Sequence, residues 1–421
     1  MSLSKALPGR VITVMHAGGE RRAYLVNGDG IEDDYSALFV TARLRAAGLS
    51  LATQQASLNA INVLGGYCRQ AKVDLLSRFR AGVYLTDREA QALSDFAQQN
   101  FGAEAKRHRR AVELGKVRRG YEYKSPTVQS TSHFARLSYI ADFLDWLAHY
   151  LLNESNEERS RRILEMRDFV LAKRISRAPT RDDFDDREYT SRHNSIVNEL
   201  ICPGSTSNPF TSEVQPRNQL IIELPRQLGC RRGEILNIQV RDIDQVKRQV
   251  WIRRRHDAPE DMRVRQPLVK TRGRPIPISA EFLDLLLRYV AVRRTVPGAT
   301  RHRYLLVTHK AGPTQGQPMT VGAVYEVFNV LRRHPSIAHI RPHLLRHFFN
   351  NELAREQQNE ASDPNARETH RRVRNFIAGR EPHSDVDDTY TQMETKRLAR
   401  EAVLKLQERA AAATRQRKAD E

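Results

Sequence analysis

The chain has few cysteines, and their spacing excludes the protein classes that depend on them. Its 421 residues contain three cysteines, Cys68, Cys202 and Cys230, and no two of them form a Cys-x-x-Cys pair. Three cysteines in one chain cannot all be paired in disulfides. The composition is therefore typical of a protein in a reducing compartment, and we expect a cytoplasmic location.

Several sequence patterns are also missing. No stretch approaches 18 uninterrupted apolar residues, so we expect no membrane span, and Met1–Gly9 lacks the long apolar core of a signal peptide. The chain has no phosphate-binding loop of the Walker type and no Gly-x-Gly-x-x-Gly motif. These absences argue against a membrane protein, a nucleotide hydrolase and a dinucleotide-dependent enzyme.

The chain is instead rich in positive charge. Lysine and arginine total 69 against 50 aspartate and glutamate residues, which leaves a net charge of +19. A charged fraction of 28% is ordinary for a solvated surface, but the imbalance of sign favours a nucleic-acid partner. The basic segments 106–110 and 116–124 are candidate phosphate contacts, and the alternative is a solvated loop.

Changes in pattern along the chain predict its organisation. Residues 1–30 contain two short strand-like segments and predict a small β-hairpin appendage. Residues 31–177 show helical periodicity and predict a helical domain. The polar segment Arg177–Arg187 predicts a linker. Residues 190–396 mix helix and strand signals, and residues 397–421 form a helix-prone tail that we expect to dock on its own domain or on a neighbour.

The second domain is expected to contain a three-stranded antiparallel sheet formed by Val250–Arg254, Gln266–Lys270 and Arg274–Ile278. The remaining elements are helices with apolar residues three and four positions apart, and Thr86 is a cap signal for the third of them. The predicted helices span 35–46, 51–70, 87–99, 130–152, 218–228 and 282–293. In the fourth predicted helix, 130–152, we interpret Phe143 and Trp146 as packing groups.

Four short motifs carry residue types suited to chemistry on a phosphodiester. They are Arg231 in Leu228–Leu236, Lys270 in Val269–Arg274, His343 with Arg346 in Pro342–His347, and Tyr390 in Asp388–Gln392. Arginine neutralises phosphate oxygens through two parallel hydrogen bonds, and a lysine can protonate a leaving oxygen. A tyrosine can attack phosphorus when cations lower the pKa of its phenol. Such a set needs neither a cofactor nor a metal.

These motifs together resemble the tyrosine recombinase (phage integrase) family. Gly229–Asp244 is similar to its first arginine box, Val269–Ile278 to its lysine hairpin, Pro342–Phe349 to its His-x-x-Arg box and Asp388–Gln392 to its nucleophile segment. The resemblance covers about residues 190–397. It implies a mainly α fold with a small antiparallel sheet, in which a helical core-binding domain precedes an α+β catalytic domain.

The resemblance also implies an activity. Tyr390 would form a 3′-phosphotyrosine with duplex DNA, and strand exchange would pass through a Holliday junction in a homo-tetramer on DNA, without a cofactor. Arg231 and Arg346 would bind the phosphate, His343 would assist proton transfer and Lys270 would be the general acid. Integration or excision of a mobile element is the expected role, with accessory recombinases or DNA-bending proteins as further candidate partners.

One box departs from the family pattern. The family usually has Gly-His about nine residues before the tyrosine, whereas here Gly379 is followed by Arg380. Either Arg380 or His383 is a candidate for the histidine's role, and a third possibility is that neither contacts the phosphate.

Other interpretations of the same residues stay open at this point. Arg231 alone is compatible with an ion pair to Glu234 at a helix end, and His343 with His347 has the spacing of a zinc site. No glutamate of a His-Glu-x-x-His motif accompanies the histidines, so a metal is disfavoured. The alternative functions are a type IB topoisomerase and a catalytically silent DNA-binding relative.

Overall fold

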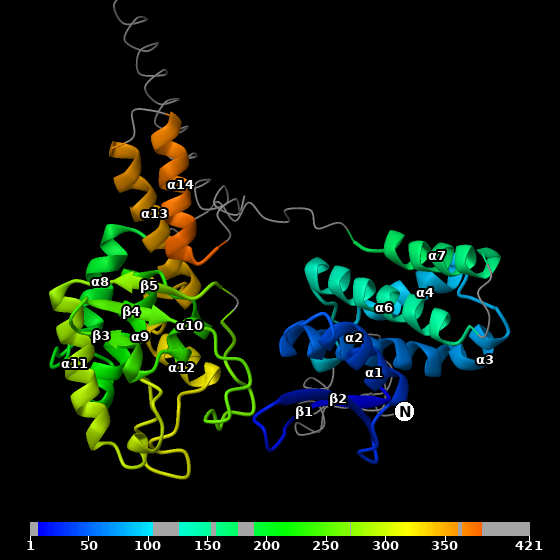
Figure 1. Ribbon diagram of the computed structural model, residues 1–421, viewed down its shortest axis with the longest axis horizontal. Helices are drawn as coiled ribbons and strands as arrows, with labels where there is room; N and C mark the ends of the chain where they lie inside the picture. Colours follow the sequence, from blue (N-terminus) through cyan, green and yellow to red (C-terminus); the bar gives the residue numbers. More distant parts are fainter. Residues whose placement is uncertain are drawn as a thin grey trace, which may run out of the picture. The chain divides into compact units, whose positions relative to one another are not determined.

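The computed structural model describes the chain in six segments, 7–103, 126–152, 157–175, 189–269, 271–360 and 364–380. The chain divides into two compact units, Met1–Asp182 and Asp183–Glu421 (Figure 1). Each unit has a hydrophobic core of its own. Among the described residues, none of the helices has both the length and the apolar composition of a membrane span.

Unit 1 begins with the predicted hairpin. Strands β1 (Gly9–Met15) and β2 (Arg21–Asn27) pair antiparallel along their full length. The hairpin packs on α2 (Leu51–Ala71), where the side-chain amide of Asn62 hydrogen bonds to both the N–H and the C=O of Gly9, at 3.0 and 2.7 Å. The side chains of β2 enter the core of the helices, so the expected appendage shares that core.

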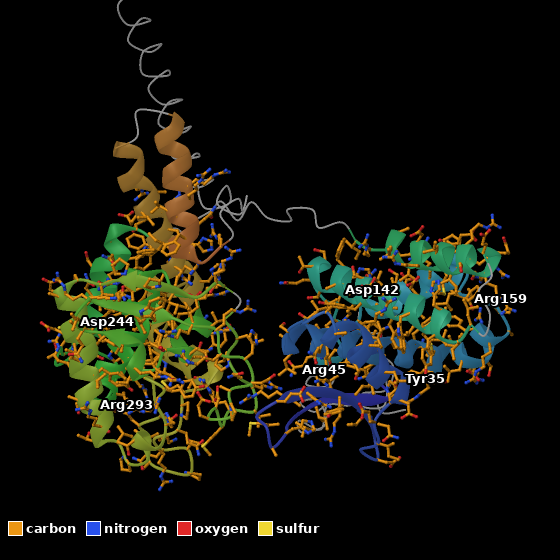
Figure 2. The ribbon with its side chains drawn as sticks, in the orientation of Figure 1. Tyr35, Arg45, Asp142, Arg159, Asp244 and Arg293 are labelled. Atoms are coloured by element: carbon orange, nitrogen blue, oxygen red, sulfur yellow. The ribbon has the colours of Figure 1, made fainter. Side chains whose placement is uncertain are left out.

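Further helical segments follow in the described part of unit 1. They are α1 (Asp34–Phe39), the π-helix η2 (Val40–Arg45), α3 (Leu75–Arg80), α4 (Asp87–Ala97), α6 (Ser130–Tyr150) and α7 (Glu157–Ala172). The predicted helix 35–46 therefore corresponds to α1 followed directly by the π-helix η2. Arg45 in η2, which is labelled in Figure 2, pairs with Glu20 and ties this segment to the hairpin.

The local signals in this unit are confirmed. Thr86 caps α4 in a reciprocal pair with Glu89, because each side chain accepts the other residue's backbone N–H. Phe143 and Trp146 are buried packing groups, and both rings lie 5.4 Å from the ring of Phe39 between centroids. Aromatic packing of this kind explains how α1 and α6 are held together.

Unit 2 contains ten regular elements and four short 3₁₀ turns among its described residues. The helices are α8 (Ser191–Ile201), α9 (Gln215–Leu228), α10 (Arg232–Asn237), α11 (Ala280–Thr295), α12 (Val321–Leu331), α13 (Pro342–Glu360) and α14 (Pro364–Ala378). The 3₁₀ turns are η3 (Ser212–Val214), η4 (Val240–Asp242), η5 (Ala299–Arg301) and η6 (Pro335–Ile337). In Figure 1, α13 and α14 form a helical hairpin in which the start of α13 and the end of α14 are joined to the rest of the unit.

The sheet of unit 2 is three-stranded and antiparallel, as predicted, but one strand was assigned wrongly. Its order is β3 (Ile243–Asp244), β4 (Gln249–Ile252) and β5 (Arg274–Pro277). The described part of the predicted strand Gln266–Lys270 is irregular. Pro267 has no N–H for a ladder, and its carbonyl accepts instead from the side chain of Asn237. The third strand is therefore the short segment before β4.

Candidate active site

Arg231 is placed at a junction of two helices. Gly229 ends α9 in the left-handed region at φ 59°, and the chain then turns into α10 with Arg231 as its N-cap residue. A Cβ at Gly229 would overlap the ring of Phe349 on α13, so glycine also permits the close approach of that helix. The Arg231 side chain is 37% exposed. It therefore lies at the boundary between protein and solvent.

Arg346 reaches the same junction from α13. Its side chain is only 1% exposed, and Nη1 donates to the carbonyl of Gly229. Nη2 donates to the carbonyl of Ala378, at the end of α14, over 3.1 Å. Arg346 thus ties together the ends of α9 and α14.

The two arginines converge on one oxygen atom. Nη1 of Arg231 donates to the Ala378 carbonyl over 2.9 Å, and Nη2 of Arg346 donates to that same carbonyl. We call Arg231 and Arg346 the arginine clamp. Two residues from separate sequence motifs are therefore within reach of a single acceptor.

A buried carboxylate lies behind the clamp. Glu234 on α10 is 1% exposed, and its oxygens lie 3.7 Å from Nη1 of Arg231 and 3.8 Å from Nη1 of Arg346. Arg274 on β5 forms a two-pronged pair with it, at 3.1 and 3.2 Å, and Thr271 donates its hydroxyl. Burial by itself raises the pKa of Glu234, but the charges of Arg274 and Arg346 and these hydrogen bonds outweigh burial and hold the pKa below its usual value.

Glu234 and Arg274 were not among the predicted site residues. An ion pair of Arg231 with Glu234 was considered as an alternative to a catalytic role, and the two charged groups do approach each other, to 3.7 Å. The sequence signal that could have identified Glu234 is its position next to the apolar pair Ile235 and Leu236. A carboxylate buried among apolar residues needs cationic partners. Arg274 lies 40 positions away, and local spacing could not identify it.

His343 lies one turn before Arg346 on α13, and it is exposed. Its Nε2 is 3.2 Å from Nε2 of His347, so one ring donates and the other accepts. Desolvation and the charges of Arg346 and Arg231 lower the pKa of His343, which favours a neutral imidazole near neutral pH. Among the described residues, no group of three metal-ligating side chains includes these histidines.

The last described residues lead toward the predicted nucleophile. Gly379 ends α14 at φ 67°, its carbonyl accepts from the backbone N–H of Arg272 over 3.2 Å, and Arg380 donates its backbone N–H to Asn375 over 2.8 Å. The side chain of Arg380 is half-buried, and its charge contributes to lowering the pKa of His347. Three predicted site residues, Lys270, His383 and Tyr390, lie outside the described residues.

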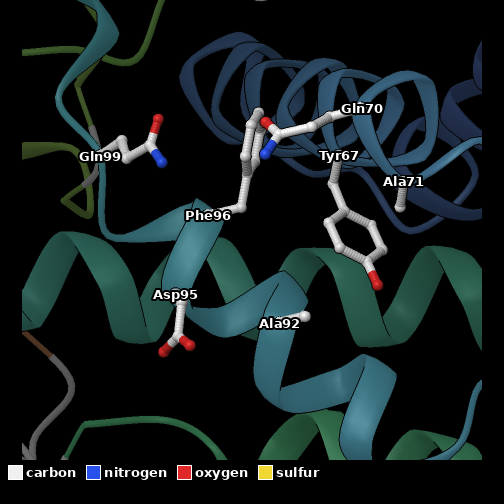
Figure 3. A pocket seen from close by; sticks show the side chains of 7 residues that line it. All are labelled: Tyr67, Gln70, Ala71, Ala92, Asp95, Phe96 and Gln99. Atoms are coloured by element: carbon white, nitrogen blue, oxygen red, sulfur yellow. The ribbon is translucent and has the colours of Figure 1, made fainter.

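Unit 1 has a pocket without any of these groups. A hollow of about 380 Å³ lies between α2 and α4 (Figure 3). Its lining consists of Tyr67, Gln70, Ala71, Ala92, Asp95, Phe96 and Gln99. It contains neither a basic side chain nor a histidine, so it does not offer a phosphate site.

Part of the chain is similar to known proteins. Residues 206–362 match the model of the phage integrase family, a range that includes both clamp arginines and His343. Over 141 residues the chain is 28% identical to transposase A of transposon Tn554 from Staphylococcus aureus. That match covers 33% of this chain and 37% of the relative, so the chain spans little more than a third of that protein's length.

A solved recombinase structure has a similar fold. A post-cleavage complex of the XerH site-specific recombinase with a palindromic difH substrate has a TM-score of 0.51 at 16% identity, and the match covers 87% of this chain and 84% of that one. The Tn1549 transposon integrase in complex with transposon right-end DNA has a TM-score of 0.44 at 15% identity, covering 85% and 93%. The arginine boxes therefore lie inside the part of the chain, residues 206–362, that matches the phage integrase family.

Proposed function

We propose that this protein is a site-specific recombinase that cleaves and rejoins duplex DNA through Tyr390, for integration or excision of a mobile element. The observation that carries the proposal is the convergence of Arg231 and Arg346 on the Ala378 carbonyl. An acceptor oxygen bound by two guanidinium groups occupies the kind of position that a phosphate oxygen requires. The similarity to a transposase over part of the chain supports the mobile-element role.

The charges around the clamp favour a phosphate. Arg231, Arg274 and Arg346 bring three positive charges to one buried negative charge on Glu234. The excess of two positive charges is available to an anion. Arg231 is partly exposed, so its guanidinium lies where a phosphate can approach it, whereas the Arg346 side chain is buried behind it.

The proposed reaction conserves the energy of the bond it breaks. The Tyr390 oxygen bonds to phosphorus, the bond from phosphorus to the 5′ oxygen breaks, and Lys270 protonates the leaving oxygen. His343 assists the transfer of the phenolic proton. A 5′-hydroxyl from the partner DNA then attacks the phosphotyrosine and releases Tyr390. No nucleotide hydrolysis is required because one phosphoester is exchanged for another.

The proposed partners follow from the same reaction. Strand exchange between two duplexes needs four active sites, so we propose a homo-tetramer on double-stranded DNA, with accessory recombinases or DNA-bending proteins as further partners. The tail, residues 397–421, is a candidate for contact between protomers. Arg380 or His383 completes the phosphate site. The proposed location is the cytoplasm, where the DNA substrate is accessible.

A nicked suicide substrate tests this proposal. DNA flanking the protein's own gene is first screened for cleavage, and a nicked duplex of the cleaved site is then incubated with the protein. We expect a protein–DNA adduct that survives denaturation, and no adduct with Tyr390→Phe, which removes only the phenolic oxygen. Site binding should be the same for both proteins.

Each other outcome supports a different function. Binding without any adduct would indicate a catalytically silent relative. Adducts that relax supercoiled DNA without Holliday junctions would indicate a topoisomerase. Adducts that persist in Tyr390→Phe would refute the assignment of the nucleophile.

A further inference from the structure

Arg274 links two parts of the candidate active site, and its own side chain is buried. We infer that it is a positioning residue, which links the buried Glu234 carboxylate to the end of α14 and thereby orients the arginine clamp. This inference rests on the proposed DNA cleavage. It concerns a residue that contacts neither solvent nor substrate, since its side chain is 1% exposed.

The first link is to Glu234. Nη1 and Nη2 of Arg274 donate to the two carboxylate oxygens over 3.1 and 3.2 Å, which fixes the plane of that group. The backbone N–H of Arg231 donates to the same carboxylate over 2.8 Å. A rotation of the Glu234 carboxylate would therefore shift the N-cap of α10, where Arg231 begins.

The second link is to α14. Nε of Arg274 donates to the carbonyl of Ile377 over 2.6 Å, one residue before the carbonyl shared by the clamp. The three arginines thus bind two consecutive carbonyls at the end of one helix. The last carbonyl oxygens of a helix have no hydrogen-bond donor within the helix, and they carry partial negative charge. From this point the chain continues to His383 and Tyr390. Arg274 therefore connects the position of the clamp to the start of the segment that carries the nucleophile.

Gly379 packs closely against Arg274 and Thr271 at this junction. At φ 67° a side chain is strained, and a Cβ there would overlap the guanidinium of Arg274 and the side chain of Thr271. The backbone hydrogen bond from Arg272 to Gly379 holds the same two segments together. The fit of Arg274 against the end of α14 is thus close enough that one added methyl group disturbs it.

Arg274→Lys tests the positioning role, because lysine keeps the charge and loses the planar fork. We expect single-turnover cleavage of the suicide substrate to fall on the order of 10²-fold, since small misplacements of catalytic groups have effects of that size. DNA affinity should stay within a few-fold of the parent. The matched control is Arg293→Lys, another buried arginine of unit 2, whose acceptors are the carbonyls of Ala299, His302 and Tyr304. It should cleave at close to the parental rate.

Amide hydrogen exchange provides a readout that does not depend on cleavage. In Arg274→Lys, the backbone amides of Arg272, Gly379 and Arg380 should exchange faster than in the parent, because the end of α14 is released. Arg293→Lys should leave these amides unchanged. Unchanged exchange in Arg274→Lys would overturn the inference even if the parent protein forms no adduct, whereas a parent without adducts would refute only the proposed function.

A double-variant cycle tests the contact between Gly379 and Arg274. Gly379→Ala alone should slow cleavage, and it should slow it less in an Arg274→Lys background, because the overlap with the guanidinium is partly removed. Purely additive effects of the two substitutions, or cleavage by Arg274→Lys within a few-fold of the parent, would show that Arg274 does not position the clamp.

Discussion

The cores of the two units are built from different kinds of side chain. Among the described residues of unit 1, the one buried aspartate, glutamate, lysine or arginine is Arg21. In the described part of unit 2, nine such residues are buried: Arg217, Glu223, Glu234, Asp242, Asp261, Arg263, Arg274, Arg293 and Arg346. Unit 1 instead packs aromatic rings between its helices, among them Phe39, Phe143 and Trp146.

This difference indicates which unit is adapted to chemistry. Burying an ion pair is weakly favourable at best, because the loss of hydration opposes the attraction between the charges. Apolar and aromatic burial stabilises a fold without that opposing cost. Unit 2 therefore retains charges that stability alone does not require, and this set includes Arg346, the buried member of the arginine clamp, and the Glu234 carboxylate behind the clamp.

The largest expected effect comes from removing a clamp arginine. Arg346→Ala should slow cleavage by ~10²-fold or more and also lower the free energy of unfolding by about 3–5 kcal/mol, because it breaks a buried charged network. Arg231→Ala should slow cleavage as much, yet change stability by less than ~1 kcal/mol, since its side chain is partly exposed. Suicide-substrate kinetics and urea denaturation measure the two effects.

The clamp assignment would be contradicted by cleavage within a few-fold of the parent in both variants. Equal losses of stability in both variants would contradict the division between an exposed and a buried clamp member. DNA affinity should change little in either, because many other phosphate contacts remain.

A core substitution in unit 1 should show the opposite behaviour. Leu144 on α6 is fully buried, so Leu144→Ala should lower the free energy of unfolding by about 2–5 kcal/mol through the cavity it leaves. The matched control is Leu164→Ala on α7, a leucine that is 48% exposed and should change stability by less than ~0.5 kcal/mol.

Cleavage by Leu144→Ala should be unaffected when DNA is saturating and the protein is folded, because Leu144 belongs to the core of unit 1 and the arginine clamp belongs to unit 2. A specific loss of cleavage in folded Leu144→Ala would show that the two units are less independent in function than their cores suggest.

A smaller effect is expected at the atypical box. If Arg380 acts in place of the usual histidine, Arg380→Ala should slow cleavage by ~10-fold or more, and His383→Ala should have a lesser effect. The position of Arg380 directly after Gly379 favours this order. The reverse order would assign the role to His383, and parental rates in both variants would show that neither contacts the phosphate.

The smallest expected effect concerns pH. Desolvation, together with the charges of His343, Arg346 and Arg380, lowers the pKa of His347 to about 4. As pH falls below about 6.5 the unfolded chain takes up a proton that the folded protein does not, so stability falls with pH between about 6.5 and 4. In His347→Gln this decrease should be smaller by ~1 kcal/mol, measured by urea denaturation at several pH values. An unchanged pH dependence would show that His347 does not titrate in this way.

Local order could be predicted from sequence because it depends on residues close together in the chain. The cap at Thr86 was found from its neighbours, and the helical period of 130–152 identified α6 and its buried aromatic rings. The strand prediction was wrong at Gln266–Val269, where Asn237 of α10 donates a side-chain hydrogen bond to the carbonyl of Pro267. That contact is not visible in the local pattern, which resembles a strand.

The sequence by itself determined the residue types of the site and their order along the chain, because motifs around Arg231, His343, Arg346 and Tyr390 are local patterns. Only the tertiary structure decided that Arg231 and Arg346 share the Ala378 carbonyl, and that Arg274 pairs with Glu234 behind them. These partners lie between 32 and 147 positions apart in the chain. A buried charge must find its counter-charge wherever the fold brings one near, and chain spacing does not encode that distance.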